Sequence, residues 1–563
     1  MTHTLDGIGV TPLSGVGNVV WYDGEVELDD PPAPETVDAD AERDRFEQAL
    51  GRAREEIEAE REHTAEAVGE EEAAVFDAHL QFLDDPQITG AVEDALDSGL
   101  PADHAVDEGF ADAIEQLEAA GGRMAERADD LRDIRDRLLR ILADADRVDL
   151  SALPEGTVLL AERLTPSGTA QLNPDRVAGF ATVVGGRTAH AAIFARSIGI
   201  PAVVGVGEAL LDVAADTEVV VDGEAGTVVV DPDEETRERA AESRDVSVRH
   251  DRVETADGRD IEVAANVGTP AELSAAADNG ADGIGLFRTE FLFLDRRSPP
   301  DEAEQLETYA EALDTFPDGR VVVRTLDIGG DKPIPYIDAE EPENPFLGVR
   351  GIRRSLGPDE ELFRTQLRAL LRANAEAEGD LSVMFPMIST VEEAEAALDV
   401  VEAVASELDA AGEAFERPEL GVMIETPSAV FVGDELAARL DFFSIGTNDL
   451  TQYVMAASRQ NEAVDHLHDP RHPAVLRAIH RAVEAAHDND AWIGMCGEMA
   501  GDPALTELLV GLGLDELSMS AVTIPDVKAN VAETRTDAAS ALADDALAAS
   551  TKSEVVATIT HDI

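Results

Sequence analysis

The chain has 563 residues, too many for one hydrophobic core, so two or three domains are expected. Its 119 acidic and 43 basic residues give a net charge of −76 spread along the chain, which excludes a nucleic-acid-binding surface and indicates a very salty cytoplasm. Because the sequence has no membrane-length apolar run and no signal peptide, and its lone cysteine, Cys496, has no disulfide partner, we expect a cytoplasmic protein without membrane insertion.

The N-terminal part predicts a small α/β domain with a helical insert. Residues 1–22 are punctuated by glycine and end in strand-like apolar residues. Apolar residues at helical spacing, such as Phe46 and Ile57, then mark residues 23–146. Short apolar runs separated by turn signals return in residues 147–230. We therefore expect the first and third segments to form one domain and the second to be an inserted helical module.

The C-terminal part predicts a (β/α)8 barrel. A charged stretch at residues 231–259 is typical of a linker, and residues 260–563 follow it. Eight apolar strand-like runs alternate with helical segments there, over roughly the ~250 residues usual for this fold. In such barrels the chemistry lies where strands end. The polar residues at or just past these predicted ends are Asn266, Arg288, Arg324, Asp327, Glu425, Asn448, Asp449 and Cys496.

His190 is the first candidate for chemistry. Gly185 and Gly186 follow an apolar run, and helix-forming residues follow His190, so its imidazole is predicted at a helix N-terminus. Backbone N–H groups and the helix dipole favour an arriving phosphate there and disfavour a permanent imidazolium. Most histidines serve structure, but the glycine pair and Thr188, which can hydrogen-bond phosphate, favour a nucleophile.

The segment GGRTAHAAIFARSIGIPAVVG resembles the phosphohistidine signature of enzyme I of the phosphoenolpyruvate:sugar phosphotransferase system. Dikinases that make or use phosphoenolpyruvate carry similar segments. The resemblance implies that Nε2 of His190 attacks the phosphorus in line. One departure is Ala189, where the family usually has a hydroxyl, although Thr188 remains.

A cluster of cations predicts a site for a substrate with phosphate and carboxylate groups. GIGLFRTEFLFLDR supplies Arg288, and VVVRTLDIGGDKPIPY supplies Arg324 and Lys332. Guanidinium forks bind both anionic groups in bidentate fashion, and Lys332 is one of only three lysines in the chain. Arg353 and Arg354 follow in the sequence, but for these two a solvated salt bridge is an equally good interpretation.

Two carboxylates predict a magnesium site. GVMIETPSA and FFSIGTNDLTQY bring Glu425 and Asp449 to neighbouring strand ends, with Asn448 beside them. Mg²⁺ takes one or two carboxylates together with substrate oxygens and water. Isolated acids are usually surface residues in so acidic a chain, but the flanking apolar strands argue against that interpretation. At these three residues the segments are similar to the metal-binding and signature sequences of enzyme I.

Cys496 follows a predicted strand in WIGMCGEMAGD. A thiol there can protonate the enolate left by phosphoryl loss, and the resemblance assigns this role to Cys496; a buried structural cysteine is the alternative. After TNDLTQY the family commonly shows Asp-Arg-Gly, whereas this chain has Ser458, Arg459 and Gln460. Arg459 remains a predicted phosphate contact.

The resemblance covers essentially the whole chain. It implies that phosphoenolpyruvate binds over Mg²⁺ in the barrel, that a swivelling domain brings His190 to it, and that pyruvate leaves. The phosphoryl group then passes to the histidine-containing phosphocarrier protein, docked on the helical module. The resemblance also implies a homodimer formed through the barrel. Downstream proteins choose the final acceptor, a sugar or another molecule such as dihydroxyacetone.

Two other functions are compatible with parts of the sequence. A phosphoenolpyruvate synthase or pyruvate phosphate dikinase shares the histidine domain and barrel but needs a nucleotide-binding domain, and no glycine-rich phosphate loop precedes the histidine segment. A non-catalytic regulator would tolerate the loss of Cys496, Arg324 or Glu425. Their joint presence favours a phosphotransferase.

Overall fold

The structure, a computed structural model, consists of two compact units, residues 1–246 and 247–563. Among the residues described, no helix is both long and apolar enough to cross a bilayer. The structure describes the chain except residues 1, 12, 23–27, 29–30, 68–69, 121–122, 146–149, 175, 187–189, 224, 243–247, 295, 297, 330–333, 335, 337–343, 345, 459–460 and 561–563.

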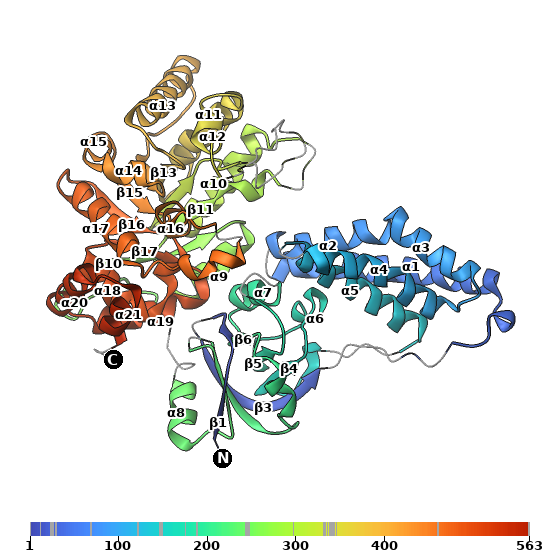
Figure 1. Ribbon diagram of the computed structural model, residues 1–563. Helices are drawn as coiled ribbons and strands as arrows, with labels where there is room; N and C mark the ends of the chain where they lie inside the picture. The colour runs from blue at the N-terminus through green and yellow to red at the C-terminus, as the bar shows by residue number, and fades with distance from the viewer. Residues whose placement is uncertain are drawn as a thin grey trace. The chain divides into compact units, whose positions relative to one another are not determined.

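The first unit contains an eight-stranded sheet with the order β1-β8-β7-β3-β4-β5-β6-β2 (Figure 1). Strands β3 to β6 are parallel, and the remaining pairs are antiparallel. The strands coincide with the apolar runs of the sequence. Their bounds are β1 (His3–Asp6), β2 (Ile8–Gly9), β3 (Ser14–Tyr22), β4 (Thr157–Ala161), β5 (Val177–Thr182), β6 (Ala202–Val204), β7 (Glu218–Asp222) and β8 (Thr227–Val230).

A helical bundle is inserted between the neighbouring strands β3 and β4 (Figure 1). Its helices share one apolar core, in which Phe46 and Ile57 of α1 and Leu131 and Leu138 of α5 are buried. The helices are α1 (Ala39–Ala67), α2 (Glu70–Leu83), α3 (Pro86–Asp97), α4 (Ala102–Ala120) and α5 (Arg123–Leu142). Two short helices, α6 (Pro166–Thr169) and α7 (His190–Ile198), follow within the sheet domain.

The segment expected as a linker is partly helical. Helix α8 (Glu234–Glu242) contacts β3 and β7 and therefore belongs to the first unit. Ala240 is buried, and Arg237 pairs with Glu218 of β7 at 2.9 Å. The charged residues that suggested a solvated linker thus lie on the outer face of helix α8. Strand β9 (Val253–Glu254) already pairs with the barrel of the second unit.

The second unit is a closed barrel of eight parallel strands, as predicted. Strand β10 pairs with both β17 and β11, which closes the ring. The strands are β10 (Asp260–Val267), β11 (Ile284–Arg288), β12 (Arg320–Arg324), β13 (Asp380–Phe385), β14 (Glu419–Ile424), β15 (Phe442–Ile445), β16 (Trp492–Met495) and β17 (Glu516–Met519).

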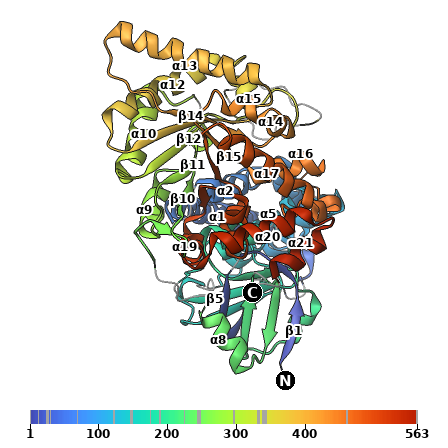
Figure 2. The same ribbon diagram turned by 90° about the vertical axis from the view of Figure 1, so that its left-hand side faces the viewer.

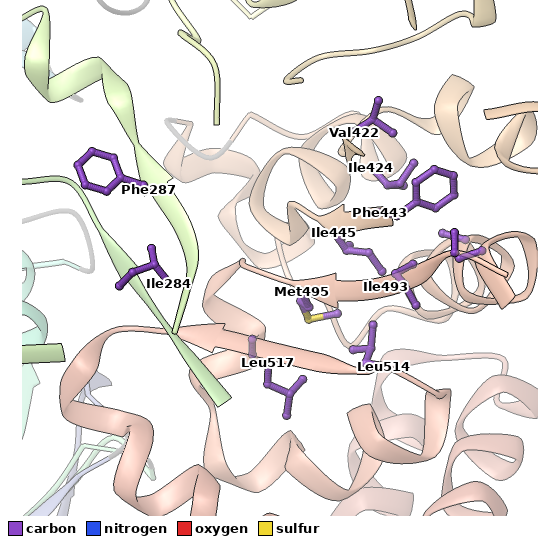
Figure 3. Close-up of a cluster of buried hydrophobic side chains, with 14 of the residues drawn as sticks. Ile284, Phe287, Val422, Ile424, Phe443, Ile445, Ile493, Met495, Leu514 and Leu517 are labelled. Carbon is purple, nitrogen blue, oxygen red and sulfur yellow. The ribbon is translucent and has the colours of Figure 1, made fainter. Parts of the chain in front are cut away.

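Alternate strand residues fill two apolar clusters. One cluster lies between the strands and the surrounding helices and includes Ile424, Ile445 and Ile493 of three neighbouring strands (Figure 3). The other lies inside the barrel and includes Met384 and Met423. The surrounding helices are α9 (Ala271–Asp278), α10 (Glu302–Thr315), α11 (Ile352–Ser355), α12 (Glu360–Glu376), α13 (Val391–Ala411), α14 (Pro427–Phe431), α15 (Gly433–Ala437), α16 (Thr447–Met455), α17 (Pro473–His487), α18 (Thr506–Leu512) and α19 (Ile524–Glu533). The chain ends on the packed helices α20 (Thr536–Ala548) and α21 (Lys552–Thr560) (Figure 2).

The N-terminal end of the barrel contains a buried pair of acids. Glu262 of β10 and Glu516 of β17 are direct neighbours in the strand register. Arg320 approaches Glu262 at 3.4 Å, whereas neither carboxylate oxygen of Glu516 has a hydrogen-bond partner among the described residues. Burial and the charge of Glu262 raise the pKa of Glu516 to about 8. The folded state therefore favours the protonated form of Glu516.

Candidate active site

The C-terminal rim of the barrel collects the polar residues predicted at the strand ends. Arg288 and Arg324 are the last residues of β11 and β12, and Glu425 and Cys496 directly follow β14 and β16. Asp449 lies in the first turn of α16, just past β15. In a barrel of parallel strands these ends share one rim, so the topology gathers the side chains around one opening.

A buried ion-pair network occupies this rim next to β12. The Nη2 atom of Arg324 lies 2.7 Å from Oε1 of Glu290, which sits in a short 3-10 helix (η4, Thr289–Leu292) after β11. The same oxygen accepts the backbone N–H of Asp327 at 3.0 Å. Asp327 Oδ2 in turn lies 3.3 Å from Nη2 of Arg350. Two arginines and two carboxylates therefore hold each other in fixed positions.

Arg324 stays charged in this setting. Burial alone would lower its pKa, but the carboxylates of Glu290 and Asp327 raise that pKa above its ordinary value. A permanently charged guanidinium with fixed orientation suits an anionic substrate because it binds phosphate or carboxylate through two N–H donors.

Glu425 and Asp449 form the candidate metal pair. Glu425 is 1% exposed, and its Oε1 accepts the backbone N–H of Met387 at 2.6 Å. Burial and the nearby charges of Asp449 and Asp327 raise the pKa of Glu425 to about 8, although Arg324 opposes the increase. The repulsion between the buried carboxylate of Glu425 and the half-buried carboxylate of Asp449 is relieved by a cation placed between them.

The chemistry of these residues fits a hard cation such as Mg²⁺. Among the described residues, no group of three or more histidine, cysteine, aspartate or glutamate side chains has the geometry of a metal site. Mg²⁺ needs only one or two carboxylates when substrate oxygens and water complete its octahedral shell. The pair of Glu425 and Asp449 therefore fits Mg²⁺ bound together with a phosphorylated substrate.

Cys496 is held at the same rim with its thiol protonated. Its side chain is buried, and Sγ lies 3.7 Å from the carbonyl oxygen of Ile445. Burial raises the thiol pKa to about 11, although Ser444 and Arg324 counteract the increase. Asn266, at the end of β10, donates from Nδ2 to the carbonyl oxygen of Cys496 at 2.9 Å and fixes its backbone. A protonated, oriented thiol is suited to donate a proton.

The remaining predicted residues are placed as follows. Asn448 Nδ2 donates weakly to Glu498 at 3.4 Å, and its carbonyl oxygen lies 3.0 Å from His468 Nε2. Arg353 forms a partly exposed ion pair with Glu393, as the solvated salt-bridge interpretation expects. Arg354 pairs with Asp359 but is buried, so its salt bridge is not a solvated one. The predicted residues that lie outside the described part of the chain are Thr188, Ala189, Lys332, Arg459 and Gln460.

His190 is the first residue of the nine-residue helix α7, as the glycine-rich turn before it indicated. Gly185 in that turn has φ 135°, a conformation that residues with a side chain rarely adopt. The backbone at His190 therefore lies at a helix N-terminus, where N–H groups can meet a phosphate.

Met387 is a residue of the rim that the sequence did not indicate. It has φ 57°, which is unusual for a residue other than glycine, and this conformation accompanies the N–H donated to Glu425. A methionine carries no sequence signal for such a backbone role, and only its place beside Glu425 reveals it.

Three domain families match the sequence along most of its length. Residues 6–127 match the N-terminal domain of PEP-utilising enzymes, and residues 153–226 match their mobile domain. Residues 242–536 match the PEP-binding domain of PEP-utilising enzymes.

Several relatives match over nearly the whole chain. A phosphoenolpyruvate-protein phosphotransferase of Haloferax volcanii is 67% identical and covers 100% of this chain and 99% of its own length. One from Bacillus sp. (strain S) is 43% identical over 97% of this chain and 96% of its own length. An NMR solution structure of Enzyme I (nEIt) is 36% identical, covers 43% of this chain and 98% of that chain, and has a TM-score of 0.35.

Proposed function

Because this chain belongs to the family of PEP-utilising enzymes, we propose that it transfers the phosphoryl group of phosphoenolpyruvate to its own His190 and then to the histidine-containing phosphocarrier protein. Pyruvate is the second product, and the reaction is the first step of a sugar phosphotransferase system. The observation that carries the proposal is the full-length similarity to phosphoenolpyruvate-protein phosphotransferases, in a chain whose barrel rim has the charges that this substrate requires.

Substrate binding is assigned to the cations of the rim. Arg324, held by Glu290, binds the phosphoryl or carboxylate oxygens, and Arg288 at the neighbouring strand end adds a second guanidinium. Lys332, Arg459 and Asn448 complete the substrate contacts, and Thr188 contacts the phosphate near His190.

Glu425 and Asp449 would hold Mg²⁺ at this rim. When bound, Mg²⁺ offsets negative charge on the transferring phosphoryl group. The raised pKa of Glu425 supports this assignment, because a site with excess negative charge favours a cation.

Phosphoryl transfer breaks the bond between phosphorus and the enol oxygen and forms a bond between phosphorus and Nε2 of His190. The enolate that remains takes a proton at carbon from the thiol of Cys496 and becomes pyruvate. The thiolate then regains a proton from water. The protonated state of Cys496 supports this role, since a general acid must carry its proton when the enolate forms.

The domains divide these tasks. The α/β domain of residues 1–22 and 147–230 carries His190 and swivels between two sites. The helical module of residues 23–146 receives the phosphocarrier protein, and the barrel of residues 260–563 binds phosphoenolpyruvate and forms a homodimer. The protein acts in the cytoplasm of a salt-adapted cell, in keeping with its acidic composition and its Haloferax relative.

A labelling experiment tests the proposal. The protein is incubated with phosphoenolpyruvate labelled in its phosphoryl group, with Mg²⁺ and high salt. Wild type is expected to acquire an acid-labile label, His190→Ala to acquire none, and His480→Ala, a surface change on α17, to behave as wild type. Labelled protein should lose its label when the phosphocarrier protein is added. A His190→Ala variant that still becomes labelled would contradict the assignment.

A further inference from the structure

Helix α7 packs with its two sides against different parts of the first unit. Ala191, Ala192 and Ala195 belong to the apolar core beneath the sheet. Phe194 is 1% exposed and instead belongs to the core of the helical bundle, the only residue from outside the inserted segment among the buried members described there. Figure 1 shows α7 between the sheet strands and the bundle. Phe194 therefore anchors α7 to the bundle.

Position 190 lies on the side of α7 that faces the bundle. In an α-helix, residues four apart lie one turn from each other on the same face, so positions 190 and 194 share a face. Phe194 packs into the bundle, and residue 190 precedes it by one turn on the same face of α7. The face of α7 that begins at residue 190 is therefore the face that packs against the bundle.

A second, polar contact joins the same two parts through helix α6. The hydroxyl of Ser167 accepts from Nη2 of Arg137 at 2.6 Å and donates to Oδ2 of Asp133 at 2.6 Å. The backbone N–H of Ser167 donates to the same Asp133 oxygen at 3.3 Å. Nearby, Arg163 after β4 pairs with Asp129 of α5 at 2.7 Å. The contact therefore has an apolar part at α7 and a polar part at α6.

The polar part can open without leaving buried charges uncompensated. Arg137 also binds Glu60 at 2.6 Å and Glu56 at 3.2 Å, both within the bundle. Burial would raise the pKa of Asp133, but His79 and Arg137, also within the bundle, act with Ser167 to hold it below its ordinary value. When Ser167 leaves, Arg137 and Asp133 keep their charged partners within the bundle and lose only hydrogen bonds to a neutral group. Asp129 loses Arg163 but keeps Arg132, which lies 2.5 Å away within the bundle.

We infer that Phe194 is a positioning residue. Its contact with the bundle favours the half-reaction that donates the phosphoryl group to the carrier over the half-reaction that accepts it from phosphoenolpyruvate. With Phe194 in the bundle core, the face of α7 that begins at residue 190 packs against the module that receives the phosphocarrier protein. To reach phosphoenolpyruvate in the barrel, α7 must leave the bundle and Phe194 must leave its core. The apolar contact of Phe194 therefore sets how much of the protein is ready to donate to the carrier. This inference rests on the proposed function.

Replacing Phe194 tests the inference through a split between the two half-reactions. In Phe194→Ala, transfer from phosphorylated protein to the phosphocarrier should slow by about tenfold or more, while labelling by phosphoenolpyruvate stays within about twofold of wild type. Hydrogen exchange of the Ser167 amide should become faster, because docking of α6 weakens together with that of α7. Phe194→Leu keeps much of the buried volume, so its rate of transfer to the carrier should lie between those of wild type and Phe194→Ala. The leucine variant also provides the test if the alanine variant does not fold.

Phe110→Ala is the matched control. Phe110 of α4 is 2% exposed in the same bundle core but belongs to the bundle itself. Phe110→Ala should lower the free energy of unfolding but should change the rate of labelling by phosphoenolpyruvate and the rate of transfer to the carrier to the same extent. Equal slowing of both half-reactions in the Phe194 variants, or an unchanged rate of transfer to the carrier, would overturn the inference. Absence of labelling in wild type would refute the proposed function instead, and hydrogen exchange at Ser167 would still test the docking.

Discussion

Arg324 and Glu290 form an ion pair of 2.7 Å inside the barrel rim, where their side chains are 9% and 1% exposed. Glu290 also accepts the backbone N–H of Asp327, so one carboxylate orients both a substrate-binding candidate and the loop that follows it. The orientation of the Arg324 guanidinium therefore depends on Glu290, which does not itself need to touch the substrate.

Glu290→Gln should weaken both the fold and substrate binding. Removing one partner of a buried ion pair typically costs about 3 kcal/mol or more, because the remaining charge is left uncompensated. We expect a lower free energy of unfolding in urea at high salt and a higher KM for phosphoenolpyruvate. Glu402→Gln, in the exposed pair with Arg417, is the control and should change stability by less than about 1 kcal/mol. Equal effects of both substitutions would contradict the buried-pair account.

Glu425→Gln should remove activity without lowering the stability of the metal-free protein. The glutamine keeps an acceptor for the Met387 N–H but ends the repulsion from Asp449. We expect phosphoryl transfer to fall by about 10²-fold or more, because the charge that binds the cation is lost. Unfolding in a chelator above pH 8 should show a free energy equal to or above that of wild type. A marked loss of stability would indicate a structural role for this carboxylate.

Cys496→Ala should slow turnover more than binding. General acid catalysis contributes about 10² to 10⁴ in rate, whereas the thiol adds little to ground-state affinity. Single-turnover labelling and phosphoenolpyruvate titration separate the two quantities. Cys496→Ser keeps a proton donor of similar size and should recover part of the rate. Unchanged turnover in the alanine variant would leave Cys496 with a packing role only.

The same thiol predicts a stability difference at high pH. Its folded pKa of about 11 lies above the ordinary value of 9.0, so the native state holds a proton that the unfolded chain has released. The stabilisation is complete below pH 9 and is lost as pH rises to 11. Relative to Cys496→Ala, wild type should lose up to a few kcal/mol across this interval. Urea unfolding of both proteins at pH 8.5 and 10.5 measures the change.

Glu516→Gln should become more stable than wild type as pH rises. Burial and Glu262 raise the pKa of Glu516 from 4.5 to about 8, so the folded state favours the protonated acid. The stabilisation that protonated Glu516 contributes to the folded state is complete below pH 4.5. Up to a few kcal/mol of it is lost as pH rises to about 8. Unfolding curves of both proteins between pH 5.5 and 8 provide the comparison. Glu376→Gln, exposed on α12, should show no such trend.

The architecture follows from local patterns that the sequence displays openly. The eight apolar runs of the barrel became β10 to β17, because buried parallel strands need nearly continuous apolar residues. Residues such as Arg324 and Cys496 could be placed at strand ends for the same reason. The positive φ of Met387 and the packing of Phe194 in the core of the helical bundle depend on tertiary contacts, which no local sequence pattern encodes. Helix α8 was expected as a linker because its charges outweighed the apolar signal of Ala240.

The insertion of the bundle between β3 and β4 has a consequence for the order of folding. The two strands pair directly, yet β3 ends at Tyr22 and β4 begins at Thr157, so pairing them in an unfolded chain would close a very long loop. The bundle has a core of its own and mostly local contacts, and such units form quickly. Once α1 to α5 assemble, the two ends of the insert are brought together. Pairing β3 with β4 then closes a much shorter loop and costs less conformational entropy. The bundle thus acts as an internal template for the domain that surrounds it. Substitutions that disrupt the bundle core should therefore slow the folding of the sheet domain that carries His190.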